Sequence, residues 1–166
     1  LCEKHSDVAF HCYTNGTLVD QAFCDEMKRV GNLSLSISLE GFEDTNDFRR
    51  GDGVYAKVLH AMDLLHENGL LFGNSVCYTR KNMDAVTSDE FFDLLIEHGS
   101  RFAWYFHLMP VGMDASPELM PTKEQREYIY HRIREVQGRE GGKEIYVMDF
   151  QNDGEFVGGC IAGGRN

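Results

Sequence analysis

The chain has 166 residues, 42% of them hydrophobic and 26% charged, which suits one globular domain with a sizeable core. Its net charge of −11 argues against a nucleic-acid backbone as the main partner, because such sites need clustered lysines and arginines. Apolar runs reach strand length only, short of the ~20 residues of a spanning helix, so no membrane partner is expected.

A strand, a polar loop, a capped helix and a glycine recur along the chain. Residues 8–13 predict the first strand, and Thr17 with Asp20 indicates a capping box that opens a helix. That helix is expected to end at Gly31, in the position that favours a left-handed backbone. Residues 33–39 alternate leucine or isoleucine with serine, which predicts a second strand with one apolar face.

The same order continues through the second half of the chain. After a polar loop, apolar residues at helical spacing over positions 54–65 predict the next helix. Thr87 and Thr122, each followed three residues later by Glu or Gln, indicate the starts of two more helices. Three further strands are predicted, over residues 70–78, 101–109 and 145–150.

Strands that alternate with helices predict an α/β fold whose strands pair in parallel through right-handed crossovers. A closed eight-stranded barrel usually takes about 250 residues, so four to five strands predict an open sheet or an arc of a TIM-like barrel. We expect this domain to cover residues 1–150, with a glycine-rich tail over 151–166. The long polar loops follow the strands, which places chemistry at the strands' carboxyl ends.

The second strand and its end carry candidate ligand contacts. Ser34, Ser36 and Ser38 share one face, where small side chains leave room for a ligand or simply pack on small neighbours. Glu40 follows the strand and is able to accept hydrogen bonds from a ribose diol, or is an ordinary loop charge. Arg50 lies in the expected loop before the next helix and could pair with a ligand carboxylate, or belong to a solvated charge cluster.

The histidines and cysteines indicate a catalytic or metal site less clearly than the second strand indicates ligand contacts. His107 lies near the end of the aromatic fourth strand, where it suits an acid, a base or a substrate contact, or a hydrogen-bonded core histidine. No histidine has a second metal ligand at a recognisable spacing, and no G-x-S-x-G or Walker loop occurs. The five cysteines are odd in number and lack a C-x-x-C pair, which favours reduced thiols in a cytoplasmic protein.

Three ordered segments resemble the radical S-adenosylmethionine (SAM) superfamily, in its branch with SPASM or Twitch auxiliary-cluster domains. Residues 13–19 (Y-T-N-G-T-L-V) look like the third strand and turn of that family. Residues 37–41 (I-S-L-E-G), followed by Asp47 and Arg50, look like its fourth strand, where S-L-D-G and D-x-x-R are more usual. Residues 109–112 (M-P-V-G) look like the end of its sixth strand.

The resemblance implies a full-length enzyme with a [4Fe–4S] cluster and SAM, whose reductive cleavage yields a 5′-deoxyadenosyl radical for hydrogen abstraction. It implies that Ser36, Ser38 and Glu40 lie toward the SAM ribose or carboxylate and that Arg50 steadies the carboxylate. Asn15 and His107 would line the adenosyl or substrate side. The family's C-x-x-x-C-x-x-C loop and G-G-E segment are absent from the sequence. The chain is therefore expected to be an inactive fragment that holds neither cofactor.

Further expectations follow from the resemblance. Cys160 looks like the first cysteine of an auxiliary-cluster domain, and alone it would be a free thiol because such clusters need further thiolates. A peptide is the favoured substrate, on family grounds. An arc of barrel leaves a strand edge unpaired, which predicts a dimer or aggregation. The alternatives are a self-contained TIM-like or flavodoxin-like enzyme and a non-catalytic α/β interaction domain.

Overall fold

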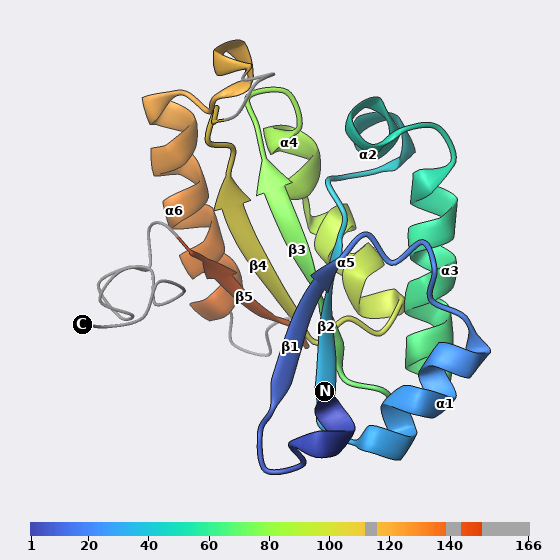
Figure 1. Ribbon diagram of the computed structural model, residues 1–166. Helices are drawn as coiled ribbons and strands as arrows, with labels where there is room; N and C mark the ends of the chain where they lie inside the picture. Colours follow the sequence, from blue (N-terminus) through green and yellow to red (C-terminus); the bar gives the residue numbers. More distant parts are fainter. Residues whose placement is uncertain (112–115, 139–143, 151–166) are drawn as a thin grey trace.

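A computed structural model describes residues 1–111, 116–138 and 144–150 of the chain. Five strands form one parallel sheet in the order β1-β2-β3-β4-β5, so each strand pairs with its neighbours in sequence (Figure 1). The strands are β1 (Phe10–Thr14), β2 (Leu33–Ser38), β3 (Phe72–Tyr78), β4 (Phe102–His107) and β5 (Tyr146–Asp149).

Helices connect the strands and pack against the sheet, as the alternation predicts. They are α1 (Gln21–Val30), α2 (Glu43–Arg50), α3 (Val54–Glu67), α4 (Met83–Val86), α5 (Asp89–Glu97) and α6 (Lys123–Gly138), with short 3₁₀ turns at Cys2–Lys4 and Pro117–Leu119. The parallel α/β arc is confirmed. The flavodoxin-like alternative is wrong, because that fold places its first strand between the second and third, whereas here the order is sequential.

The helix caps explain where the sequence-based boundaries hold and where they shift. Helix α1 begins after Asp20, whose carboxylate accepts a hydrogen bond from the Phe23 amide at 2.8 Å, so the box predicted at Thr17 is wrong. Ser88 rather than Thr87 caps α5. The third predicted box is confirmed, because Thr122 and Gln125 exchange backbone-to-side-chain hydrogen bonds at 3.0 and 3.2 Å.

The two faces of the sheet differ in what covers them. Leu35, Ile37 and Val76 point toward the helices and belong to one buried core that also takes in Met62 and Phe91. On the opposite, inner face, the rings of β1 and β4 approach each other across β2 and β3. Three strand spacings of about 4.8 Å separate those strands along the sheet, so ring contact between them requires a strongly curved arc.

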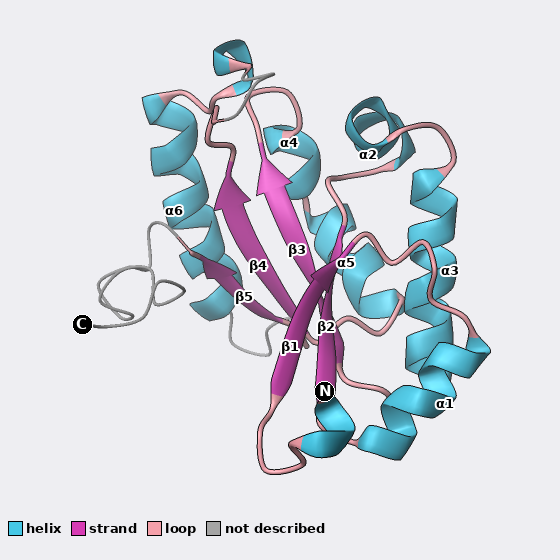
Figure 2. Cartoon of the chain, in the orientation of Figure 1, coloured by secondary structure: helices cyan, strands magenta, loops and turns pink. Residues whose placement is uncertain are grey.

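The region that sequence patterns predicted as a polar loop after β2 contains helix α2. Figure 2 shows this helix at the end of the sheet toward which the arrowheads of β1 to β4 point. The helix is polar and exposes Phe48, so it lacks the apolar stripe by which helices are predicted. None of the helices in the described ranges is long and apolar enough to cross a membrane.

Candidate functional site

The candidate site lies beyond the carboxyl end of β2, where a buried carboxylate meets two arginines of α2. Glu40 has no exposed surface, and its Oε1 lies 2.5 Å from Arg50 Nη2. Its Oε2 lies 3.5 Å from Arg49 Nε. A buried carboxylate is costly unless it is paired, so Glu40 fixes both guanidinium groups at this edge of the sheet.

Two asparagines hold the backbone of Glu40 in place. The Glu40 amide donates to Asn46 Oδ1 at 3.2 Å, and its carbonyl accepts from Asn82 Nδ2 at 3.1 Å. Asn82 also donates to the Cys77 carbonyl at the end of β3. Both asparagines are buried, so the end of β2 is tied rigidly to α2 and to the loop after β3.

Asp47 sets the position of α3 relative to α2. Its two carboxylate oxygens accept hydrogen bonds from the Gly53 amide at 2.6 Å and the Tyr55 amide at 2.8 Å. Burial by itself would raise the pKa of the Asp47 carboxyl. These two bonds and one from the side-chain amide of Asn46 outweigh burial, so the pKa is lowered. Asp47 thus serves the N-terminus of α3, which leaves Arg49 and Arg50 as the charged groups of this segment that line the pocket.

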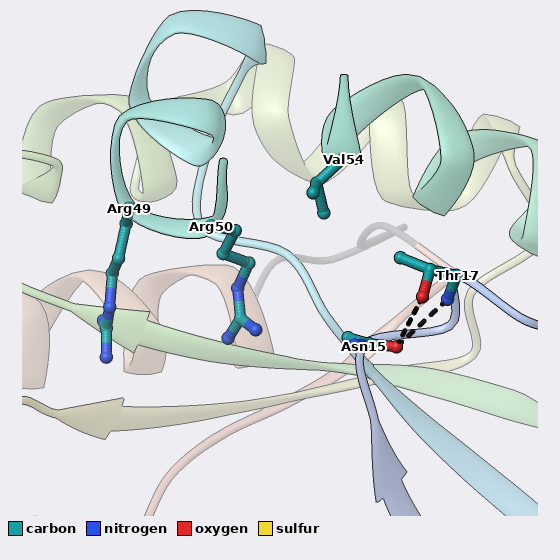
Figure 3. Close-up of a pocket in the computed structure, with 5 residues that line it drawn as sticks. All are labelled: Asn15, Thr17, Arg49, Arg50 and Val54. Carbon is teal, nitrogen blue, oxygen red and sulfur yellow. Dashed lines mark hydrogen bonds between the residues drawn. The ribbon is translucent and has the colours of Figure 1, made fainter. Parts of the chain in front are cut away.

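A small pocket of about 230 Å³ opens beside Arg50. Figure 3 shows Arg49 and Arg50 extending from α2 toward the strand ends, with Asn15 and Thr17 approaching from the loop after β1. Val54, at the start of α3, completes the lining. Asn15 Oδ1 accepts hydrogen bonds from the Thr17 amide at 3.2 Å and the Thr17 hydroxyl at 3.0 Å, which fixes the loop.

Arg50, which lines this pocket, has a hydrogen-bond donor that indicates an anionic ligand. Arg50 Nε is buried and has no hydrogen-bond partner among the described residues. A buried, unpaired guanidinium N–H is costly, and a carboxylate or phosphate oxygen would satisfy it. The volume is below the ~300 Å³ at which pockets for whole ligands begin, so the pocket suits one anionic group of a larger molecule.

The structure brings some of the predicted residues together and separates others. Asn15 and Arg50 line the pocket, Glu40 lies behind Arg50, and half-buried Ser38 ends β2. Ser36 is buried, and its hydroxyl lies 2.9 Å from His11 Nε2. These placements fix positions, whereas the ligand roles of the residues stay predictions.

His107 does not join this group. His107 lies on the same face of β4 as Tyr105, whose hydroxyl donates to the Val86 carbonyl on the helix side. The His107 ring lies 6.2 Å from that of Tyr78, and burial followed by the charge of Arg126 lowers its pKa. The structure therefore does not bring His107 to the pocket. Cys160 and the rest of the predicted tail lie outside the described residues.

Sequence patterns missed the residues that organise the site. Asn46 and Asn82 are anchors that act through backbone groups distant in sequence, and a single amide has no local pattern. In the sequence, Arg49 is only a neighbour of Arg50 in a cluster of charged residues, so no ligand role was predicted for it. A cue was present for α2, because acidic residues open it and Arg49 and Arg50 close it, as the helix dipole favours.

The residues present do not suit an iron–sulfur cluster. Within residues 1–111, 116–138 and 144–150, no group of three His, Cys, Asp or Glu side chains could hold a metal ion. Cys2, Cys12, Cys24 and Cys77 are all free. No chemical step is therefore assigned to a cluster held by this part of the chain. The pocket beside Arg50, in contrast, fits the carboxylate of a ligand such as SAM.

The fold is thus an arc of a parallel α/β barrel with an arginine-lined pocket at the carboxyl edge of its sheet. The family model of the Radical SAM superfamily matches residues 1–92, more than half of the chain. The chain belongs to this superfamily.

Curated relatives match most of the chain. It is 26% identical over 150 residues to the Fe-coproporphyrin III synthase of Methanosarcina barkeri (strain Fusaro / DSM 804), covering 87% of this chain and 37% of the relative. It is 28% identical over 127 residues to the AdoMet-dependent heme synthase of the same organism, covering 75% and 35%. The chain thus spans little more than a third of the length of these relatives.

A solved structure supports the fold independently. Native anSMEcpe with bound AdoMet and Cp18Cys peptide matches with a TM-score of 0.69 at 14% identity, covering 89% of this chain and 43% of the other. At this identity the likeness shows the fold alone. It shows that this fold occurs in a protein whose solved structure contains bound AdoMet.

Proposed function

We propose that the whole protein is a radical SAM enzyme and that this chain supplies part of its SAM site. The observation that carries the proposal is the pocket at the strand ends that Arg49 and Arg50 line; Arg50 also has a buried Nε without a hydrogen-bond partner among the described residues. In this assignment Arg50 binds the SAM carboxylate, and Glu40 orients Arg50 from behind. Asn15 and Ser38 lie toward the remainder of the ligand.

When bound, SAM would supply a 5′-deoxyadenosyl radical for hydrogen abstraction, with methionine as the leaving group and the electron coming from a cluster that the described part of this chain does not hold. The share of this chain is binding and orientation. A fixed guanidinium restricts the carboxylate to one position and so aligns the rest of the molecule above the strand ends. Arg50 cannot swing away freely, because its Nη2 is held by a fully buried carboxylate.

Two substrate classes are open to such an enzyme. The solved structure with a bound peptide supports a peptide substrate through fold alone. The two curated relatives, at higher identity, are named for coproporphyrin and heme synthesis. We propose the tetrapyrrole class as the stronger of the two, since the sequence relation extends over 75% and 87% of the chain.

The test compares SAM with its carboxyl methyl ester in the whole protein and in an Arg50→Gln variant. Loss of the ligand charge should weaken binding by about tenfold or more in the wild type, as expected for a buried charge-assisted pair. In Arg50→Gln the difference between the two ligands should become clearly smaller, because the carboxylate has lost the partner that this chain supplies. Equilibrium dialysis with labelled ligands measures all four affinities.

An Arg29→Gln variant is the matched control, because Arg29 forms ion pairs with Glu3 and Glu26 on the surface of the molecule. It should keep the wild-type difference between SAM and the ester. If Arg50→Gln keeps that difference undiminished, Arg50 does not bind the carboxylate and the proposed site is wrong.

A further inference from the structure

A second pocket, of about 290 Å³, opens at the carboxyl edge of the sheet, and the SAM proposal does not use it. Helix α2 contributes Asp44, Thr45, Phe48 and Arg49, which form two pairs spaced four positions apart and therefore share one face of the helix. The rest of the lining comes from the loop after β3 and from the short turn Pro117–Leu119. Arg49 lines this pocket as well as the SAM pocket.

Hydrogen bonds fix the loop and the turn, so the pocket is preformed. Asn82, which lines it, accepts a hydrogen bond from the Thr79 amide at 2.6 Å and donates one to the Cys77 carbonyl at 3.2 Å. The Arg80 amide donates to the Leu119 carbonyl at 2.9 Å and so ties the turn to the loop. Pockets for small molecules are usually preformed, and their volumes begin at about 300 Å³. This pocket therefore has the rigidity and nearly the size that a small ligand needs.

The pocket contains an aromatic ring that the packing of α2 leaves open. Phe48 is 69% exposed, a larger fraction than for any other aromatic side chain in the described ranges. Lys81 Nζ lies 4.7 Å from the centroid of this ring, and Leu119 adds a second apolar group to the lining. Aromatic and aliphatic walls with a few polar groups are typical of ligand pockets, so this lining favours a ligand with an apolar body.

The cations of the pocket retain capacity for an anionic group. Lys81 forms no ion pair within the described ranges, and its ammonium contacts the ring of Phe48. Arg49 has only long contacts, from Nη1 to the Cys77 carbonyl at 3.4 Å and from Nε to Glu40 Oε2 at 3.5 Å. A guanidinium carries more N–H donors than these two contacts use, so Arg49 is able to bind a further carboxylate.

Asp44 is the one carboxylate of the lining, and its position gives the pocket a direction. It lies in the first turn of α2, whereas Arg49 lies in the last turn, and the helix separates them by about 7.5 Å along its axis. Lys81 lies over Phe48, the neighbour of Arg49 in sequence, so both cations are at the same end. In a chain of net charge −11, such a basic end favours an anionic group.

We infer that this pocket is a second ligand site and that it takes a small carboxylate with an apolar body, such as one ring on a short chain. The carboxylate lies between Lys81 and Arg49, and the apolar part lies against Phe48 and Leu119. The inference goes beyond the proposed function, because SAM is placed in the other pocket and the second site binds its ligand without SAM.

The probe for this site is 3-(4-fluorophenyl)propionate, which is titrated into the whole protein without SAM and followed by fluorine NMR. The corresponding primary amide is the uncharged reference. The acid should bind saturably and about threefold more tightly than the amide, as expected for a partly exposed ion pair.

Three substitutions outside the SAM pocket test the parts of the site separately. Phe48→Ala should weaken binding of the acid by about fivefold through loss of the aromatic wall, and Phe48→Leu should weaken it less. Lys81→Gln should weaken binding of the acid by about threefold and leave the amide unchanged. Asp44→Asn should tighten binding of the acid by about twofold, because it removes a repelling charge.

Lys28→Gln and Tyr128→Ala are the matched controls, since Lys28 on α1 and Tyr128 on α6 do not line this pocket. Both should leave the titration unchanged, and circular dichroism verifies the fold of every variant. Equal binding of acid and amide, absence of saturation, or undiminished binding in Phe48→Ala overturns the inference. So does the reverse charge pattern, in which Asp44→Asn weakens binding and Lys81→Gln tightens it, because that pattern marks a site for cations.

Failure of this inference and failure of the SAM proposal are distinguishable. The probe titration requires no SAM, and the comparison of SAM with its methyl ester requires no probe. Phe48→Ala should keep the wild-type difference between SAM and the ester, because Phe48 does not line the SAM pocket. Saturable binding of the acid in a protein with no carboxylate effect at Arg50 would refute the SAM site alone, and the opposite pair of results would refute the second site alone.

Discussion

The two faces of the sheet are built from the same strands yet have different tasks. On the helix side, Leu35, Ile37 and Val76 are almost fully buried among apolar side chains. On the inner side, serines alternate with them along β2, and aromatic rings stand at the flanks. The helix side therefore stabilises the fold, while the inner side and its upper edge leave polar and aromatic groups available for binding.

The edge above β2 belongs to neither face and combines properties of both. Glu40 is as buried as any core residue, but it is charged and holds two arginines. Such an arrangement costs stability relative to apolar packing, and it is explained by the position it gives to Arg50. The comparison teaches that burial alone does not separate structural from functional residues here, whereas the polar partners do.

The largest effect is expected from the helix side. Ile37→Ala should lower the free energy of unfolding by about 4 kcal/mol, because Ile37 is fully buried and its neighbours cannot close the cavity. Ser36→Ala, one position away on the inner face, should cost only about 1 kcal/mol through one lost hydrogen bond to His11. Urea denaturation measures both, and equal losses would refute the division between the faces.

The second-largest loss of stability is expected at the charged edge, where Glu40 meets Arg49 and Arg50. Arg50→Met should cost about 3 kcal/mol, because it leaves the Glu40 carboxylate buried with only the longer contact to Arg49. Adding Glu40→Gln should restore most of this loss by removing the buried charge. A double-mutant cycle from urea denaturation gives the coupling, and strictly additive effects would show that the pair is not coupled.

The exposed edge of the sheet is a third point of comparison. Strand β1 has a sheet neighbour on one side only within the described residues, and Cys12 on it is exposed. If the chain dimerises through this edge, Cys12→Lys should raise the dimer dissociation constant by about tenfold, since an edge lysine opposes strand pairing. Light scattering over a concentration series measures it; a wild type that remains monomeric throughout contradicts the expectation.

The smallest effect concerns pH and the inner face. The folded pKa of His11 is lowered from its ordinary value of 6.5 by burial, so the unfolded chain binds a proton more readily. Its contribution to stability is complete above pH 6.5 and is lost as the pH falls toward the folded pKa. His107 acts in the same direction.

His11→Asn should therefore reduce the loss of stability between about pH 7.5 and about pH 5.5, while the contribution of His107 remains. Urea denaturation at the two pH values measures the difference. An unchanged pH dependence in the variant would mean that His11 does not titrate as its surroundings indicate.

Local patterns predicted most of the architecture and only part of the site. The alternation of leucine, isoleucine and serine located β2 and its two faces, and glycines located the ends of helices such as α1 at Gly31. Helix α2 escaped prediction because its polar sequence has no apolar stripe. Glu40 and Arg50 were predicted from their positions after the second strand, whereas Asn15 was predicted only through the family resemblance.

By itself, the sequence determined a parallel α/β arc, because periodicity, caps and glycines act over a few residues. Only the tertiary structure decided that Glu40 forms ion pairs with two arginines and that the His107 side chain lies on the helix side of the sheet. It also decided that His11 and Trp104, 93 positions apart, face each other across the inner face. The physical reason is that strand curvature and register set these contacts, and both arise from the packing of the whole sheet rather than from any local run of residues.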